Sequence, residues 1–256
     1  MPSAARIARE ILDELLAVGL PKRATLMAAE YMPTKLVHLG CTVPDVRRIA
    51  RSHTRELKAD PARTVDLALA LVARRNHDAR QVAYELLGAI PSARDGLSVK
   101  QLEALFDGND NWSAVDGFCS ALSGPQYSAG VLAPAVLERW ARSRDPWLRR
   151  AALATVATAF QRSALRGQSP VTASVRVCTR LVDDRHDHVV KALSWALRNL
   201  ASRDREVVER FVAEHEARLA ARVKREVVRK LATGTKNKSK RRARGVPSQE
   251  LRARIP

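Results

Sequence analysis

The sequence predicts an all-α protein whose antiparallel helices stack side by side. Apolar residues recur at helical spacing along nearly the whole chain, and the strict alternation typical of a strand is almost absent. Alanine, leucine, arginine and valine dominate the composition, whereas glycine and proline number only 11 and 12. The intervals between the apolar patterns are short, so tight turns should join neighbouring helices.

Start signals mark many of the predicted helices. Five prolines stand at or near a first helical turn, where a missing N–H is harmless: Pro21, Pro44, Pro61, Pro134 and Pro146. Asp60 and Asp145 each precede one of these prolines and are good N-cap residues. The predicted helices are 3–18, 21–32, 44–57, 61–75, 78–89, 98–106, 111–123, 131–143, 146–161, 170–183, 187–201, 204–216 and 218–232.

Three segments share one sequence pattern: DPARTVDLALALVARRN, DPWLRRAALATVATAF and DHVVKALSWALRNLA. Each begins with an acidic cap and mixes small and branched apolar residues with basic ones. This resembles HEAT-type repeats, whose helix pairs stack into a curved solenoid with a concave face. We expect a HEAT-like solenoid with a concave basic groove as one domain over residues 1–232.

The net charge of +18 indicates a polyanionic partner. Residues 233–256 contribute +7 of it and contain almost no apolar material, which predicts a disordered basic tail that adds salt-dependent phosphate binding. The other +11 belongs to residues 1–232, so the tail is not the whole cause. A genome that favours arginine codons is the alternative explanation.

Several classes of protein are disfavoured. No apolar run reaches 18 residues, and acids interrupt the N-terminal apolar pattern, so we expect neither a membrane span nor a signal peptide. The cysteines, Cys41, Cys119 and Cys178, make neither a disulfide framework nor a zinc spacing, which favours a cytoplasmic protein. Nucleotide-binding, metalloprotease and hydrolase signatures are absent. The acids and histidines of DDRHDHVVK (183–191) have a spacing that could suit a metal, but a loop that leads into a helix N-cap explains the acids better. No cofactor is expected.

Trp195 lies outside the apolar stripe of helix 187–201. Its apolar residues form one stripe: Val189, Val190, Ala192, Leu193, Ala196, Leu197 and Leu200. Trp195 lies roughly 140° from the centre of that stripe, among Lys191, Arg198 and Asn199. This predicts an aromatic ring on a polar, basic face; the alternative is packing against a neighbouring helix.

The segment NDNWSAVDGF (109–118) combines a cap, a tryptophan and an acid. Trp112 and Asp116 are four residues apart, so they are neighbours on one helix face. Asp116 lies beyond the edge of a core stripe made by Val115, Phe118, Cys119 and Leu122. Spacing alone favours a solvated or arginine-paired border residue. Trp140 and Trp147 are interpreted as packing residues.

Four segments together resemble one family, the bacterial DNA alkylation repair enzymes of the AlkD-like type, which are alkylpurine DNA glycosylases. They are YMPTKLVHLGCTVPDVRRIAR (31–51), NWSAVD (111–116), DPWLRRAAL (145–153) and DHVVKALSWALRNLA (187–201). The resemblance covers roughly residues 5–232 and is most specific at W-x-x-x-D and S-W-x-L-R. It implies a HEAT-like solenoid whose basic groove holds double-stranded DNA.

The resemblance also implies a catalytic trio of Asp116, Trp112 and Trp195. It places Arg150 and, more weakly, Tyr31 near DNA. Further candidates for DNA binding, chosen as nearby cations, are Arg149, Lys191, Arg198 and Lys35. The expected activity is release of cationic N3- or N7-alkylated purines from double-stranded DNA, leaving an abasic site, by a monomer in the bacterial cytoplasm near the nucleoid. A non-catalytic HEAT-like module that binds nucleic acid or scaffolds other proteins is the alternative.

Overall fold

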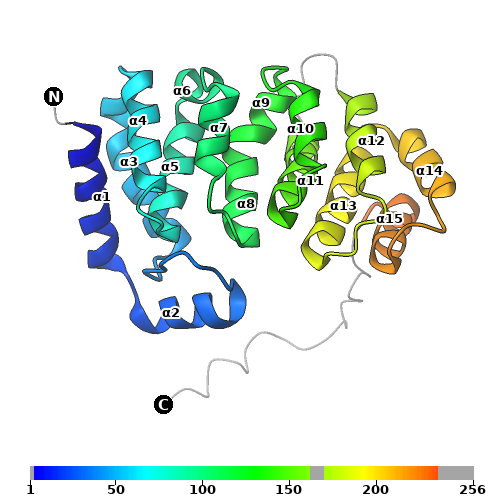
Figure 1. The fold of residues 1–256 in the computed structure, drawn as a ribbon, viewed down its shortest axis with the longest axis horizontal. Coiled ribbons are helices and arrows are strands. Elements are labelled where there is room, and N and C mark those ends of the chain that lie inside the picture. The colour runs from blue at the N-terminus through cyan, green and yellow to red at the C-terminus, as the bar shows by residue number, and fades with distance from the viewer. Residues whose placement is uncertain (1–2, 162–169, 236–256) are drawn as a thin grey trace, which may run out of the picture.

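The all-α prediction is confirmed by the computed structural model, which describes residues 3–161 and 170–235. Those residues form helices and connecting turns without a strand, and a lone bridge joins Val37 to Asn76. The helices stand side by side in a long array that begins with α1 (Ala4–Val18) and ends with α14 (Arg205–Glu214) and α15 (Ala221–Thr233) (Figure 1). The architecture is an all-α helical repeat.

One layer of the array carries the residues of interest. Each of its helices packs on the next in chain order. Its members are α3 (Val43–Leu57), α5 (His77–Ala89), α8 (Trp112–Phe118), α11 (Pro146–Gln161), α13 (Asp187–Leu200) and α15. Helix α13 therefore lies between α11 and α15, and α8 lies between α5 and α11.

The other layer supports the first from one side. It consists of α1, α4 (Pro61–Val72), α7 (Val99–Phe106), α10 (Pro134–Trp140), α12 (Val171–Arg180) and α14. Short helices α6 (Pro91–Asp95) and α9 (Gly124–Ser128) connect the layers, and neither was predicted as a separate helix. Helix α2 (Pro21–Leu26) crosses one end of the array beneath the first helices (Figure 1).

Two of the predicted helices contain a π-helical turn. Segment η1 (Met27–Tyr31) extends α2, and η2 (Cys119–Ser123) joins α8 to α9. In η2 the carbonyl of Cys119 accepts hydrogen bonds from the Gly124 N–H and from the hydroxyl of Thr158 on α11. A Cβ on Gly124 would lie 2.1 Å from the Thr158 Oγ1, so only glycine lets α11 approach this closely. Both π-helical turns adjoin the candidate site described below.

The apolar stripes predicted from sequence form the core. The stripe of α13 and the stripe that begins at Val115 are buried throughout. Trp140 is 1% exposed and donates its Nε1–H to Glu103 at 2.7 Å, which confirms that it is a packing residue. Its ring lies 6.2 Å from that of Phe118, which in turn is 5.3 Å from Phe106. This aromatic cluster fixes α7, α8 and α10 relative to one another.

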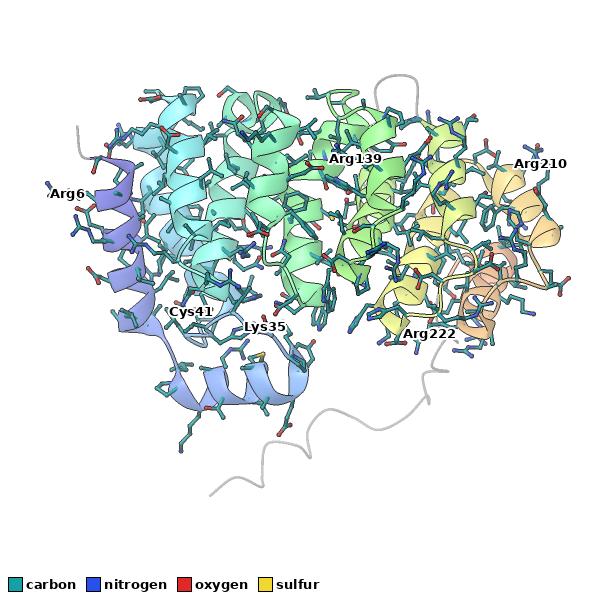
Figure 2. All side chains as sticks on the ribbon, viewed as in Figure 1. Arg6, Lys35, Cys41, Arg139, Arg210 and Arg222 are labelled. Atoms are coloured by element: carbon teal, nitrogen blue, oxygen red, sulfur yellow. The ribbon has the colours of Figure 1, made fainter. Side chains whose placement is uncertain are left out.

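Basic residues occur along the whole length of the array. Arg6, Arg139, Arg210 and Arg222 lie at well-separated places along the array (Figure 2). The three cysteines are free and buried. Among the described residues, no helix combines the length and hydropathy required of a membrane span. The predicted tail, apart from its first residues to Thr235, falls outside the part that the structure describes.

Candidate active site

Trp112 occupies the first position of α8, and polar contacts fix the turn before it. Asn111 is the N-cap, and its Oδ1 accepts a hydrogen bond from the Ala114 N–H at 2.9 Å. Asn109 is 3% exposed, and its Oδ1 accepts from Nη1 of the buried Arg80 at 3.0 Å. The start of α8 is thus anchored to α5, which bears Arg80, as well as to its own first turn.

The same turn also holds the chain that follows η1. Asp110 accepts a hydrogen bond from the backbone N–H of Lys35 at 2.6 Å and another from the hydroxyl of Thr34. The Asn111 side-chain amide donates to that hydroxyl at 3.3 Å. These bonds join segments about 75 residues apart in the sequence. They therefore place Tyr31, at the end of η1, beside Trp112.

The rings of Tyr31 and Trp112 meet edge to face. Their centroids are 5.4 Å apart with planes at 82°, and the indole N–H of Trp112 donates to the Tyr31 carbonyl at 3.2 Å. Tyr31 is 58% exposed, so its ring projects from the surface while its backbone is held. The structure brings together these two residues, of which Tyr31 had the weaker support from sequence.

Asp116 lies one helical turn after Trp112 and forms a two-point ion pair with Arg150 of α11. The Nε of Arg150 donates to Oδ1 at 3.0 Å, and its Nη2 donates to Oδ2 at 2.7 Å. The Arg150 Nη1 donates to the backbone carbonyl of His188 at 2.7 Å. The guanidinium thus orients the Asp116 carboxylate while it is itself held by α13.

Burial and pairing act in opposite directions on Asp116. Burial raises the pKa of its carboxyl, and the charge and hydrogen bonds of Arg150 offset part of that rise. The Asp116 side chain is 23% exposed, against 7% for Arg150. A carboxylate that is oriented, mostly desolvated and still reachable has the properties of a group that stabilises positive charge.

Trp112 lies between two surface hollows. One hollow reaches from Trp112 to α13 and is lined by Glu30, Tyr31, Pro33, Trp112, Arg150, His188 and Lys191. The other lies over α3, α5 and α8, and its lining includes Trp112 and Asp116. Because Arg150 lines the first hollow and Asp116 the second, their ion pair bridges the two. We call the first of these the aromatic hollow.

Trp195 is less exposed than a ring on an open basic face would be. It is partly buried and packs against the hydrophobic core. On the same part of α13, the Asn199 amide donates to the Ala157 carbonyl of α11 at 2.9 Å. Neighbouring helices therefore cover part of the polar face that the sequence predicts. Trp195 lies one turn after Lys191, which lines the aromatic hollow, but Trp195 itself is not among the residues that line either hollow.

All three predicted DNA-binding arginines have protein partners: besides Arg150, which pairs with Asp116, these are Arg149 and Arg198. Arg149 pairs with Asp184 at 2.6 Å, and its side chain is 20% exposed. Arg198 lies 3.8 Å from Glu226 of α15 and is 14% exposed, with its Nε bonded to the Ser194 hydroxyl. Burial lowers the pKa of Arg198. Both side chains face neighbouring helices or loops, because α11 and α13 are packed on both flanks.

Among the cations predicted to bind DNA, Lys35 and Lys191 have the most accessible side chains. Lys35 is exposed on the segment that Asp110 holds, and Figure 2 shows it at the end of the array where α2 lies. Lys191 lines the aromatic hollow with a side chain that is 42% exposed, and it pairs with Asp187 one turn earlier at 2.5 Å. Lys191 can therefore present charge to a ligand in the aromatic hollow, whereas Lys35 is not among the residues that line it.

Most of the chain matches a single family model, that of the DNA alkylation repair enzymes, over residues 11–231. The chain belongs to this family. The structure of a predicted DNA alkylation repair enzyme from Enterococcus faecalis has the same fold, with a TM-score of 0.67 at 18% sequence identity. The similarity covers 84% of this chain and 97% of that one. No curated protein sequence matches the chain.

Membership of the DNA alkylation repair enzyme family makes DNA the substrate and repair the role.

Three residues of the site were not predicted from sequence. Asp110 and Thr34 dock η1, and His188 lines the aromatic hollow. The polar run NDN before Trp112 was the available signal for the first. Within residues 3–161 and 170–235, no cluster of three or more histidine, cysteine or acidic side chains is suited to hold a metal ion.

Proposed function

We propose that this DNA alkylation repair enzyme is a monofunctional DNA glycosylase. Its substrates would be N3- and N7-alkylated purines in double-stranded DNA, which it would release by hydrolysis of the N-glycosidic bond. Such a base already carries a positive charge and is a good leaving group. The observation that carries the proposal is Asp116, which Arg150 orients at two points one helical turn from Trp112, whose ring in turn contacts Tyr31.

The chemistry requires stabilisation of a cation. As the glycosidic bond breaks, positive charge develops on the deoxyribose. An oriented carboxylate stabilises that charge and can position the attacking water, and this is the role we assign to Asp116. The aromatic faces of Trp112 and Trp195 would stabilise the cationic sugar or base by cation–π contact. The bidentate pair favours the ionised carboxylate that this role requires.

Open hollows suit bulky or charged adducts. The aromatic hollow is a surface feature bordered by Tyr31 and Lys191, both of which have exposed side chains. A glycosylase that encloses an extruded base needs a tight pocket. An enzyme that leaves the cationic base in contact with solvent does not, and it would tolerate a larger substituent on the purine. We therefore propose that the base stays outside any enclosed pocket.

The test is release of base from duplex DNA treated with a methylating agent. We expect the wild-type chain to release 7-methylguanine or 3-methyladenine, quantified by chromatography, and to leave abasic sites. Asp116→Asn keeps the shape but removes the charge, so its rate of release should fall about 10²–10³-fold. Asp184→Asn is the matched control, because Asp184 also pairs with an arginine of α11 but lies in a loop contact.

Binding of methylated duplex DNA without release of a base would favour the alternative function, a non-catalytic module. A wild-type chain that binds methylated duplex well but releases neither base would be a non-catalytic nucleic-acid-binding module. An equal loss of release in Asp116→Asn and Asp184→Asn, with both variants folded, would remove Asp116 from the chemistry.

A further inference from the structure

Three rings form a cluster beside the aromatic hollow. Trp147 belongs to the first turn of α11, His186 directly precedes α13, and His188 is the second residue of α13. The centroid of Trp147 lies 4.8 Å from that of His188 and 6.1 Å from that of His186, and the two histidine rings are 5.9 Å apart. From sequence, Trp147 was interpreted as a packing residue, and no role was predicted for the two histidines.

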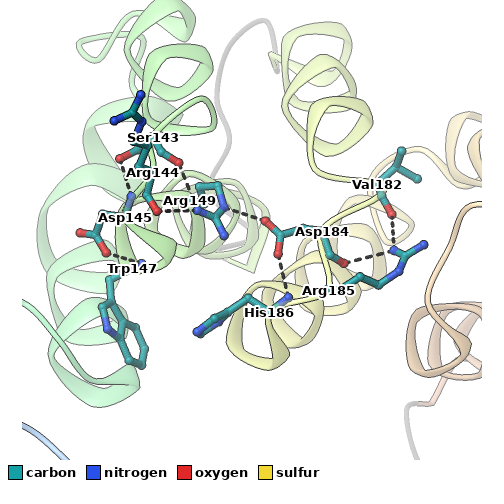
Figure 3. Close-up of polar contacts among 9 residues, drawn as sticks. All are labelled: Ser143, Arg144, Asp145, Trp147, Arg149, Val182, Asp184, Arg185 and His186. Carbon is teal, nitrogen blue, oxygen red and sulfur yellow. Dashed lines mark hydrogen bonds and ion pairs between the residues drawn. The ribbon is translucent and has the colours of Figure 1, made fainter.

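The backbone on both sides of the ring cluster is fixed. Asp145 accepts a hydrogen bond from the Trp147 N–H at 2.9 Å, and Asp184 accepts from the His186 N–H at 2.9 Å. Arg149 links the two loops through its ion pair with Asp184. Figure 3 shows the rings of Trp147 and His186 projecting to the same side of this polar bridge. The rings are therefore held side by side before any ligand arrives.

The ring cluster is continuous with the candidate active site. His188 lines the aromatic hollow together with Trp112 and Lys191, and its carbonyl accepts the hydrogen bond from Arg150. His186 is exposed, whereas Trp147 and His188 are partly buried. A ligand that lies across the hollow can therefore reach the ring cluster without any rearrangement of the chain.

The charges around His188 are mostly positive. Arg150 of α11 and Lys191 of α13 both face it, together with the His186 ring. The acids are Asp187, which pairs with Lys191, and Glu30 of η1 across the hollow. Burial, followed by the charges of Arg150 and Lys191, lowers the pKa of His188, which favours the neutral ring in the free protein.

We propose that Trp147, His186 and His188 form a second DNA-contact surface, on which His188 takes up a proton from solvent when a backbone phosphate of the duplex lies against it. A phosphodiester supplies the negative charge that an imidazolium needs, and the charged ring then donates a hydrogen bond to a phosphate oxygen. The face of Trp147 would pack on the sugar or base beside that phosphate. The inference rests on the proposed function only in taking duplex DNA as the ligand.

Proton uptake makes DNA affinity depend on pH in a defined direction. If the pKa of His188 is higher in the complex than in the free chain, binding tightens as pH falls. Each unit by which the pKa rises contributes up to about tenfold in affinity. The DNA phosphates do not titrate between pH 5.5 and 7.5, so the dependence must come from the protein.

The experiment measures binding of an undamaged fluorescent duplex by anisotropy at pH values from about 5.5 to 7.5, at constant ionic strength. We expect the Kd of the wild-type chain to be about tenfold lower at pH 5.5 than at pH 7.5. His188→Gln keeps a hydrogen-bonding side chain but does not titrate there, so most of the pH dependence should disappear. Trp147→Leu should weaken binding at every pH and keep the dependence. His53→Gln is the matched control, because His53 pairs with Glu14 elsewhere in the array.

A wild-type affinity that does not change with pH would overturn the proposal, as would a full pH dependence in a folded His188→Gln variant. Circular dichroism establishes that each variant is folded. The test involves no base release, so it is independent of the glycosylase assay. A chain that binds with the expected pH dependence but releases no alkylated base would overturn the proposed function alone.

Discussion

Arg149 and Arg150 are consecutive residues of α11 that pair with aspartates in opposite settings. Arg149 reaches Asp184 in the loop before α13, and it also donates to the carbonyls of Ser143 and Arg144 (Figure 3). Arg150 reaches back to Asp116 on α8. The first pair ties two loops together, and the second orients a carboxylate beside aromatic rings.

The difference lies in what surrounds each carboxylate. The side chain of Asp184 is 10% exposed. One of its carboxylate oxygens accepts a hydrogen bond from Arg149, and the other accepts one from the His186 N–H. Asp116 is 23% exposed, accepts from Arg150 alone among the described contacts, and lies one turn from Trp112. An arginine–aspartate pair therefore indicates function only where the acid keeps access to a hollow.

After the loss of Asp116 itself, we expect Arg150→Ala to have the largest effect on activity. This variant would sharpen the comparison between the two arginine–aspartate pairs. Without the two-point contact the Asp116 carboxylate is free to rotate, and misplacement of a catalytic group costs about 10²-fold in rate. Single-turnover release of alkylated base measures this directly. Arg150→Lys should recover only part of the loss, because an ammonium cannot pair at two points in the same plane. Full activity in Arg150→Ala would show that the pair does not orient Asp116.

A smaller effect of Arg150→Ala is expected on the way the rate of base release depends on pH. Base release requires ionised Asp116, so the rate should fall as pH drops through the pKa of this carboxyl. Because burial raises that pKa, the fall should begin at a higher pH than the ordinary aspartate value of 3.8 would give. Arg150 lowers the pKa, so Arg150→Ala should move the fall to still higher pH. An unchanged profile in that variant would mean that another group controls the acid limb.

The smallest effect on activity is expected from Arg149→Ala. This variant loses the bonds between two loops, which should lower the free energy of unfolding by about 2 kcal/mol. Urea unfolding measures that loss. Release of base per folded molecule should change less than about threefold, because Asp116 and Arg150 keep their contacts. If Arg149→Ala lost as much activity as Arg150→Ala, the contrast between the two pairs would be wrong.

Much of the fold followed from local pattern. Helical periodicity and proline starts predicted nearly every helix, and the buried stripes of α8 and α13 were identified residue by residue. The two helices that were not predicted separately, α6 and α9, have only five residues each, too few to show a period. The π-helical turn η2 was not predicted either, because it depends on Thr158 of a distant helix.

The candidate site was only partly predictable. Spacing made Trp112 and Asp116 neighbours, and the resemblance to the repair family added Trp195, Arg150 and Tyr31. The direction of each arginine was not predictable, since Arg198 could face the hollow or Glu226. Such choices depend on how helices pack and which rotamer the packing leaves room for.

The sequence by itself determined the helices, their apolar faces and the adjacency of Trp112 to Asp116, since these depend on contacts within one or two helical turns. Only the tertiary structure decided that Arg150 rather than Arg149 meets Asp116, and that Tyr31 meets Trp112 across 81 positions of sequence. Periodicity fixes which face of a helix is buried. The offset between packed helices, which no local pattern contains, fixes which side chains meet.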